Sequence, residues 1–330
     1  MGYTMGAMHK YLFLALLFVF GVAFTGTAHA ATLTVCDDGC DYSTIDAAFA
    51  AANEGDVIDV QGGVSGYDPV GENFGISGIV FPEASITLQC TGGATISQTD
   101  PTGVNTLFLS TTSTITGCLF ENINLSTPES VYTSGIRIVN NSFTQGATGT
   151  IDFLDGHVAY AEISGNANIR WLRSTASSTS MLISGNTFYG DKPIDEADTR
   201  GTALGLVGTS TTPTIQNNTF LMGYDASETV AYNSSFLHVY ADGMTFTKNR
   251  VGVTSLAPPA NLKMTLDIRT IGGAFSLSGN TLTSPLDSGS CQTVNIQPAL
   301  EIGMTPSFTF TNNTLRTRCG GTGDIVKVHS

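Results

Sequence analysis

Five side chains that could carry out proton-transfer chemistry lie close together between residues 149 and 173. They are Asp152, Asp155, His157, Arg170 and Arg173. A lyase needs a base to remove a proton and a cation to stabilise the enolate that forms. About one coil of a repeating chain separates the acids from the arginines, so the five side chains could share one face. The alternative is a solvated patch of surface salt bridges, which contributes little energy.

Trp171 is the only tryptophan of the chain, and it lies between Arg170 and Arg173. A tryptophan ring has a large apolar face and a polar N–H, so it can serve as a platform on which a sugar ring stacks. We therefore treat Trp171 as a candidate substrate-binding residue.

The same stretch, GTIDFLDGHVAY at residues 149 to 160, resembles the Gly-Thr-Val-Asp-Phe-Ile-Phe-Gly motif of pectin methylesterases. That resemblance implies that Asp152 is the nucleophile. The family's Gln-Asp-Thr-Leu and Leu-Gly-Arg-Pro-Trp segments are missing from this chain. We therefore favour the other interpretation, in which Asp152 and Asp155 are turn residues beside an inward-facing Phe153.

A second acidic stretch, YGDKPIDEADTRG at residues 189 to 201, lies between two repeats. Its candidate calcium ligands are Asp191, Asp195, Glu196 and Asp198. Several carboxylates on one loop can hold Ca²⁺ through oxygen ligands. The spacing lacks the order of a calcium loop, and Lys192 and Arg200 partly neutralise the charge, so a solvated acidic loop is the alternative.

Several classes of function are excluded by what the sequence lacks. It contains no Gly-x-Ser-x-Gly elbow, no His-Glu-x-x-His helix, no paired Cys-x-x-Cys and no phosphate-binding glycine loop. Serine hydrolases, zinc proteases and nucleotide-dependent enzymes therefore lose support. The net charge of -14 also argues against nucleic acid as a partner, because binding needs cations that neutralise phosphates.

The elements that would position these residues are indicated by a repeat. Segments such as ISGNTF, IVNNSF, IQNNTF, LSGNTL and FTNNTL place an Asn between an aliphatic residue and a Phe or Leu. The aligned asparagines are Asn122, Asn141, Asn166, Asn186, Asn218, Asn249, Asn280 and Asn313. They recur at gaps of 19 to 33 residues, and a recurrence of this size is typical of a solenoid.

Each repeat contains short runs with alternating apolar and polar residues, such as SFTFTN and FLHVYAD, and no long amphipathic helix. Three short strands and three turns fit one coil of a parallel β-helix. Stacked coils place equivalent residues about 4.8 Å apart. An Asn at one turn can then bond to the equivalent Asn in the next coil, so we expect a structural Asn ladder rather than a repeated binding site.

The amino-terminal stretch DYSTIDAAFAAANEGDVIDVQGG, residues 41 to 63, reads as a short helix at about 43 to 52, a turn and a strand at 57 to 60. It resembles the capping segment of the pectin lyase-like superfamily. This resemblance implies an all-β, single-stranded, right-handed parallel β-helix with a short capping helix. It leaves the activity open, because the superfamily includes lyases, hydrolases, esterases, epimerases and adhesins.

The six cysteines fit such coils. Cys36 and Cys40 are close enough in sequence to close a short loop, and Cys90 to Cys118 and Cys291 to Cys319 share one separation of 28 residues. If each separation is one coil, both pairs lie on adjacent coils within disulfide distance. We predict Cys36–Cys40, Cys90–Cys118 and Cys291–Cys319 among the pairings that six cysteines allow.

Residues 1 to 30 form a predicted secretory signal peptide, with a lysine-bearing start, an apolar run and Ala-His-Ala before the cleavage site. A single-pass anchor is the alternative, although the apolar run is shorter than a membrane span needs. Residues 31 to 330 are predicted to be one β-helix domain, with 31 to 63 as its cap and first strand. After cleavage we expect a secreted chain, extracellular or periplasmic, with no membrane span.

Two functions remain open at this stage. The first is a secreted protein that binds or processes an extracellular polysaccharide, or binds a cell-surface glycan, along a β-helix face. If it is an enzyme, the resemblance suggests a polysaccharide lyase, a glycoside hydrolase or a pectin esterase-like protein, with Ca²⁺ as a candidate cofactor. The second is a non-catalytic surface, adhesion or structural protein that presents loops on a rigid rod. The sequence does not predict the oligomeric state.

Overall fold

The structure is a computed structural model, which describes part of the chain. The described residues are 30–62, 79–82, 84–97, 106–128, 132–144, 150–153, 157–175, 177–190, 201–207, 212–222, 234–253, 262–270, 273–283, 292–298, 307–316 and 326–328. The predicted signal peptide, Asp155, the four candidate calcium ligands and the Cys291–Cys319 pair lie outside these residues.

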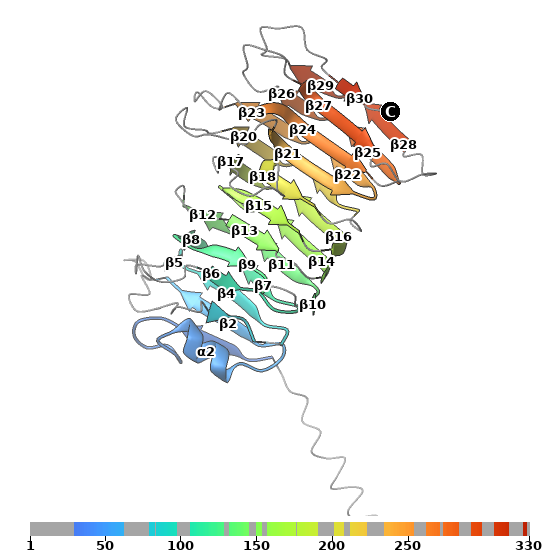
Figure 1. Cartoon of the computed structure of the whole chain (residues 1–330). Helices are drawn as coiled ribbons and strands as arrows, with labels where there is room; N and C mark the ends of the chain where they lie inside the picture. Colours follow the sequence, from blue (N-terminus) through green and yellow to red (C-terminus); the bar gives the residue numbers. More distant parts are fainter. Residues whose placement is uncertain are drawn as a thin grey trace, which may run out of the picture.

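The fold is the all-β parallel β-helix that the repeat predicts, with one short helix at its amino-terminal end (Figure 1). The strands stack from α2 at the blue end of Figure 1 to β28, β29 and β30 at the red end. They form long parallel sheets in which each strand pairs with its equivalents in the neighbouring coils. Parallel strands that return to the same sheet through a crossover wind right-handed, which is the handedness expected here.

Sheet A forms one face. Its strands are, in order, β1 (Thr32–Val35), β2 (Val57–Gln61), β4 (Thr87–Thr91), β7 (Thr114–Thr116), β11 (Ile136–Val139), β14 (His157–Ser164), β16 (Ser177–Ser184), β19 (Thr214–Gln216), β22 (Met244–Thr247), β25 (Ala274–Ser278) and β28 (Ser307–Thr311), with β10 (Tyr132–Thr133) also paired to β14.

Sheet B forms the second face. Its strands are β3 (Ile79–Val80), β6 (Thr106–Phe108), β9 (Asn124–Ser126), β13 (Thr150–Phe153), β15 (Trp171–Ser174), β18 (Gly201–Leu206), β21 (Ser234–Ala241), β24 (Leu262–Thr270), β27 (Gln292–Pro298) and β30 (Val326–Val328).

The third face consists of two shorter sheets. Sheet C contains β5 (Thr95–Ser97), β8 (Leu119–Glu121) and β12 (Ser142–Phe143); sheet D contains β17 (Thr187–Gly190), β20 (Thr219–Met222), β23 (Arg250–Val253), β26 (Thr281–Thr283) and β29 (Thr314–Arg316). Isolated bridges at Ala167 and Ile169 connect the two sheets, because Ala167 pairs with Ser142 and Ile169 pairs with Phe188. One coil therefore runs from sheet A through sheet C or D to sheet B.

The interior is filled by stacked apolar side chains, one layer per coil. In sheet A, Ile138, Ile163, Ile183 and Ile215 are equivalent in register and fully buried. In sheet D, Phe188 and Phe220 stack with ring centroids 4.7 Å apart. Strand residues alternate between the two faces of a sheet, so the aliphatic and aromatic positions of the sequence repeat face inward and build one continuous core.

Helix α2 (Ile45–Ala51) closes the amino-terminal end of the stack. Thr44 begins it as the N-cap, because its side chain accepts a hydrogen bond from the N–H of Ala47 at 3.2 Å. Phe49 is buried against Phe81, with ring centroids 4.6 Å apart. The helix predicted at residues 43 to 52 therefore exists, one to two residues shorter at its ends, and it covers core residues that the first coil would expose.

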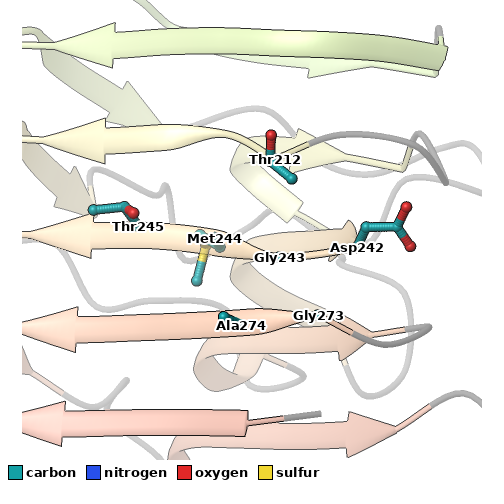
Figure 2. A pocket seen from close by; sticks show the side chains of 7 residues that line it. All are labelled: Thr212, Asp242, Gly243, Met244, Thr245, Gly273 and Ala274. Atoms are coloured by element: carbon teal, nitrogen blue, oxygen red, sulfur yellow. The ribbon is translucent and has the colours of Figure 1, made fainter. Parts of the chain in front are cut away.

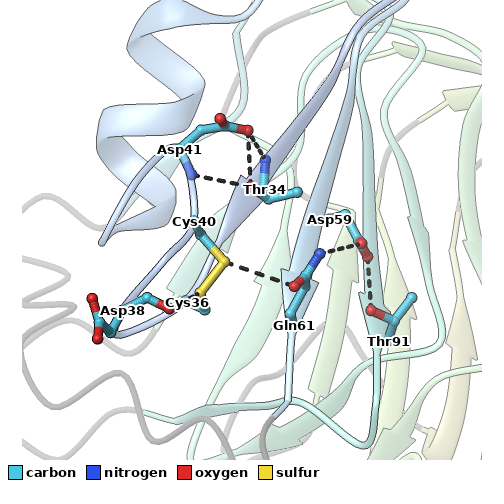
Figure 3. The surroundings of a disulfide bond; sticks show 8 residues. All are labelled: Thr34, Cys36, Asp38, Cys40, Asp41, Asp59, Gln61 and Thr91. Carbon is cyan, nitrogen blue, oxygen red and sulfur yellow. Dashed lines mark hydrogen bonds between the residues drawn. A yellow bond between two sulfur atoms is a disulfide. The ribbon is translucent and has the colours of Figure 1, made fainter.

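The cap also contains the first disulfide, Cys36–Cys40, with a Cα–Cα distance of 5.5 Å (Figure 3). Beside it, the carboxylate of Asp41 accepts hydrogen bonds from the N–H and the hydroxyl of Thr34 at 2.9 and 2.8 Å. The backbone hydrogen bond from Thr34, followed by the hydroxyl bond, holds the pKa of Asp41 below its ordinary value. The small loop is thus fixed to β1 covalently and by hydrogen bonds.

The asparagine ladder runs along the corner between sheet A and sheets C and D. Seven of the expected residues form it, namely Asn141, Asn166, Asn186, Asn218, Asn249, Asn280 and Asn313. The Nδ2 of each of the first six donates to the Oδ1 of the next asparagine at 2.8 to 3.3 Å. It also donates to a backbone carbonyl of the preceding coil, as from Asn218 to Ile183 at 2.9 Å. The amide groups of these side chains are therefore bonded on both sides.

Asn122 is a correction to the predicted ladder. It is exposed, its φ is 58°, and it lies in the turn between β8 and β9, which is one strand later in the coil. The ladder position of its coil belongs to Cys118, whose N–H donates to Asn141 Oδ1 at 3.0 Å. Cys118 is joined to Cys90, with a Cα–Cα distance of 4.8 Å. The disulfide thus continues the line of the ladder toward the amino terminus.

Candidate functional site

A polar row on the outer face of sheet B is the most developed cluster of titratable side chains in the described part of the chain. Leu172, Leu204, Leu237 and Leu266 occupy equivalent inward positions and are fully buried. The residues that follow them face the other side of the sheet. Strand β13 adds a fifth member, because its Asp152 pairs with Arg173. The outer row is therefore Asp152, Arg173, Gly205, His238 and Asp267.

An ion pair and a hydrogen-bonded His–Asp pair occupy the two ends of this row. Arg173 Nε and Nη2 lie 2.8 Å from Asp152 Oδ1 and Oδ2, in a two-bonded fork between neighbouring strands. The exposed fractions of these two side chains are 10% and 17%. Asp152 and Arg173 are therefore in contact across one coil, as their spacing in the sequence predicts. A carboxylate held by both oxygens is poorly placed to act as a nucleophile.

The other pair is His238 and Asp267, which no motif of the sequence indicates. Their side chains are buried, with 3% and 1% exposed, and His238 Nδ1 lies 3.0 Å from Asp267 Oδ2. If Asp267 is ionised, it can only accept this hydrogen bond, and Nδ1 of His238 is then the donor. A carboxylate that orients an imidazole in this way is a typical arrangement for a general base.

Gly205 separates the Asp152–Arg173 pair from the His238–Asp267 pair. It stands between Arg173 and His238 in the register of sheet B. Gly205 has no side chain, and it is buried, as are Arg173 and His238 on either side of it. From Asp152 to Asp267 the row crosses five strands, or about 19 Å at the ordinary spacing of strands.

Trp171 does not have the environment that a sugar platform needs. It precedes Arg173 on the same face of β15, and only 5% of it is exposed. The Arg173 guanidinium lies over its ring, with Cζ 4.9 Å from the centroid. The prediction of an accessible stacking ring is therefore wrong for this structure. The reason is that the outer side of sheet B is covered at Trp171. The alternation of residues along a strand indicates the face on which a side chain lies, but it does not indicate whether other residues cover that face.

The remaining members of the predicted cluster are dispersed. His157 begins β14 in sheet A, where it pairs with Tyr132 and Ser177, whereas Asp152 and Arg173 belong to sheet B. Arg170 is half-buried and lies just before β15. His157 is thus on another face of the coil from Asp152. The four described members of the cluster do not form one site, because His157 lies in a different sheet from Asp152 and Arg173; Asp155 lies outside the described residues.

A shallow pocket of about 490 Å³ lies at the corner where sheet B leads into sheet A (Figure 2). It is lined by Thr212, Asp242, Gly243, Met244, Thr245, Gly273 and Ala274. Asp242 is its only titratable side chain, and Met244 is almost fully buried. The pocket offers no pair of groups for acid–base chemistry. Among the described residues, no group of three or more His, Cys, Asp or Glu could hold a metal ion.

Comparison with known proteins adds no family assignment, because no protein-family model and no curated protein matches the chain. The resemblance of the amino-terminal cap to the pectin lyase-like superfamily therefore stays a prediction. Within the described ranges, no helix is long and apolar enough to cross a membrane.

Proposed function

We propose that this chain is a secreted β-helix protein that binds or processes an extracellular polysaccharide, with the His238–Asp267 pair of sheet B as the candidate acid–base group. The observation that carries the proposal is the buried His238–Asp267 pair on the same outer row as the Arg173–Asp152 pair. Buried ionisable groups outside the core of a solenoid have a desolvation cost that stability alone does not require. Such groups are typical of functional sites.

The chemistry of the row suits proton transfer. Nε2 of His238 would accept a proton from the sugar, with Asp267 holding the ring and stabilising the imidazolium. Arg173, which lies on the other side of Gly205 in the register of sheet B, would bind the negative charge that develops on a carboxylate or oxyanion of the substrate. A polysaccharide with acidic sugars is the substrate class that uses both groups.

The disulfides Cys36–Cys40 and Cys90–Cys118 support the extracellular part of the proposal. Disulfides persist in oxidising compartments and are rare in the cytosol. The amino-terminal sequence, with its apolar run and Ala-His-Ala site, agrees with export.

The test is the chain length of acidic and neutral polysaccharides, measured by size-exclusion chromatography before and after incubation with the protein, with and without calcium. We expect one acidic polysaccharide to shorten, and we expect His238→Gln and Asp267→Asn to abolish the shortening. Arg137→Gln, which breaks an exposed ion pair on sheet A, is the matched control and should leave the rate unchanged.

Two results would count against the proposal. If His238→Gln shortens the polysaccharide as fast as the unaltered protein, the row is not the site of the reaction. If no polysaccharide shortens and none is retained in affinity electrophoresis, the protein does not act on polysaccharide, and presentation of loops on a rigid rod becomes the better interpretation.

A further inference from the structure

The outer face of sheet A carries an uncharged array near the carboxyl-terminal end. In β19, β22, β25 and β28 every second residue faces inward, and Ile215, Phe246 and Leu277 are buried in this way. The outward residues of these four strands form two rows in register. The rows are Thr214, Thr245, Ser276 and Thr309, and Gln216, Thr247, Ser278 and Thr311. We call these eight residues the hydroxyl array.

The array is a two-dimensional lattice. Neighbouring strands lie about 4.8 Å apart, and alternate residues of one strand lie about 6.7 Å apart. The asparagine ladder runs along the adjacent corner and joins neighbouring coils of the array by hydrogen bonds. Asn218 Nδ2 donates to Asn249 Oδ1 at 3.0 Å, and Asn280 Nδ2 donates to Asn313 Oδ1 at 2.8 Å. The register of the side chains is thus set before any ligand arrives, which lowers the entropic cost of binding.

The side chains of the array are available for a ligand. All eight are half-exposed or exposed, and none makes a side-chain hydrogen bond within the described part of the chain. The middle of sheet A differs. There Arg137 pairs with Glu162 at 2.9 Å, and Ser164 donates to the same carboxylate at 2.9 Å. The hydrogen bond from Arg137 also keeps the pKa of Glu162 below its usual value.

The absence of charge in the array restricts its partner. The chain as a whole has a net charge of -14, yet the array contains only Thr, Ser and Gln. A cationic or anionic ligand would gain nothing from such a surface. The array also has no aromatic ring to stack on a sugar. A suitable partner is uncharged, forms hydrogen bonds and repeats in two dimensions.

We infer that the hydroxyl array binds the surface of ice. Water molecules in an ice face repeat in two directions at spacings similar to those of the array, and each can exchange hydrogen bonds with a hydroxyl. The methyl groups of Thr214, Thr245, Thr247, Thr309 and Thr311 add apolar contacts between the hydroxyls. This inference concerns sheet A, so it does not depend on the function proposed for sheet B.

The experiment is partition into ice. A dilute solution of the protein is frozen slowly from a cold surface, and the protein concentration is compared between the ice and the remaining liquid. We expect enrichment in the ice and a freezing point below the melting point for crystals held in the protein solution. Exclusion of the protein from the ice, with no gap between freezing and melting, would overturn the inference.

Matched variants identify the face that binds. Thr245→Tyr places a large ring on the array at an exposed position. Most of this variant should therefore stay in the liquid and be excluded from the ice. Ser276→Tyr, on the next strand, is the second variant if the first one lowers the melting temperature of the protein. Thr219→Tyr makes the same change on the outer face of sheet D and should partition into ice as the unaltered protein does.

Two further measurements separate other partners of the array. If Thr245→Tyr removes binding to microcrystalline cellulose or chitin while the unaltered protein is excluded from ice, the array binds a solid polysaccharide and the inference is wrong. If Thr245→Tyr instead converts a dimer to a monomer in light scattering, the array joins two copies of the chain, and the inference is equally wrong.

Discussion

At the scale of single residues, two adjacent asparagines of one motif have different roles. Asn217 has a φ of 56° and is exposed, so it supplies the left-handed turn. Asn218 is buried and receives the N–H and Nδ2 of Asn186 on its Oδ1, at 2.9 and 3.0 Å. Its own Nδ2 donates to Ile183 and Asn249. Equivalent positions in other coils show the same division between turn and ladder.

We predict that Asn218→Ala lowers the free energy of unfolding by about 1 to 3 kcal/mol, because it leaves buried donors of Asn186 and a carbonyl of Ile183 without partners. Urea unfolding followed by circular dichroism measures this difference. Asn217→Gly is the control, since glycine adopts the same backbone conformation, and it should change the free energy little. Equal losses for the two variants would mean that Asn218 is not a ladder residue.

How far the sequence predicts the site also depends on individual residues. The ladder was predictable because seven asparagines keep one local context, and Asn122 was misplaced because its context, ENIN, imitates that motif one strand later. His238 and Asp267 meet only because the intervening loops bring β21 and β24 into register. Loop lengths vary between coils, so no local pattern indicates that meeting.

At the scale of elements, the disulfide and the ladder join neighbouring coils at the same corner, one by a covalent bond and the other by hydrogen bonds. Cys118 holds the ladder position before Asn141, and its covalent partner Cys90 belongs to the preceding coil. In the following coils an asparagine at this position donates to a strand carbonyl of the preceding coil, as Asn141 does to Ile115 at 3.1 Å. An asparagine at position 118 would have equivalent partners, because β4 and β7 are in register.

We therefore predict that Cys90→Ser with Cys118→Asn is more stable than Cys90→Ser with Cys118→Ala. Both lose the disulfide, which costs about 2 to 5 kcal/mol in a small secreted domain. The asparagine should recover about 1 kcal/mol through new hydrogen bonds in the buried corner. Melting temperatures of the two double variants give the comparison. Identical values would show that the corner at Cys118 cannot accept a ladder residue.

At the scale of the whole molecule, a solenoid is stabilised by contacts between neighbouring coils, so the same side chain is worth less near an end of the stack. Phe246 and Phe310 offer this comparison, because β22, β25 and β28 place them in one inward column with Leu277 between them. Phe246 is fully buried, whereas Phe310, in the last strand of sheet A among the described residues, is 40% exposed.

We predict that Phe246→Ala lowers the free energy of unfolding by about 3 to 5 kcal/mol, the usual cost of removing a buried phenylalanine. Phe310→Ala should cost about 1 to 2 kcal/mol, because less of its surface is removed from water. Urea unfolding gives both values. Amide hydrogen exchange adds the spatial test, since Phe310→Ala should speed exchange only in β28 and β29 and Phe246→Ala should speed it on both sides of β22. Equal losses, or exchange that rises uniformly along the chain in both variants, would show that the coils unfold as one unit and that position in the stack does not set the value of a core residue.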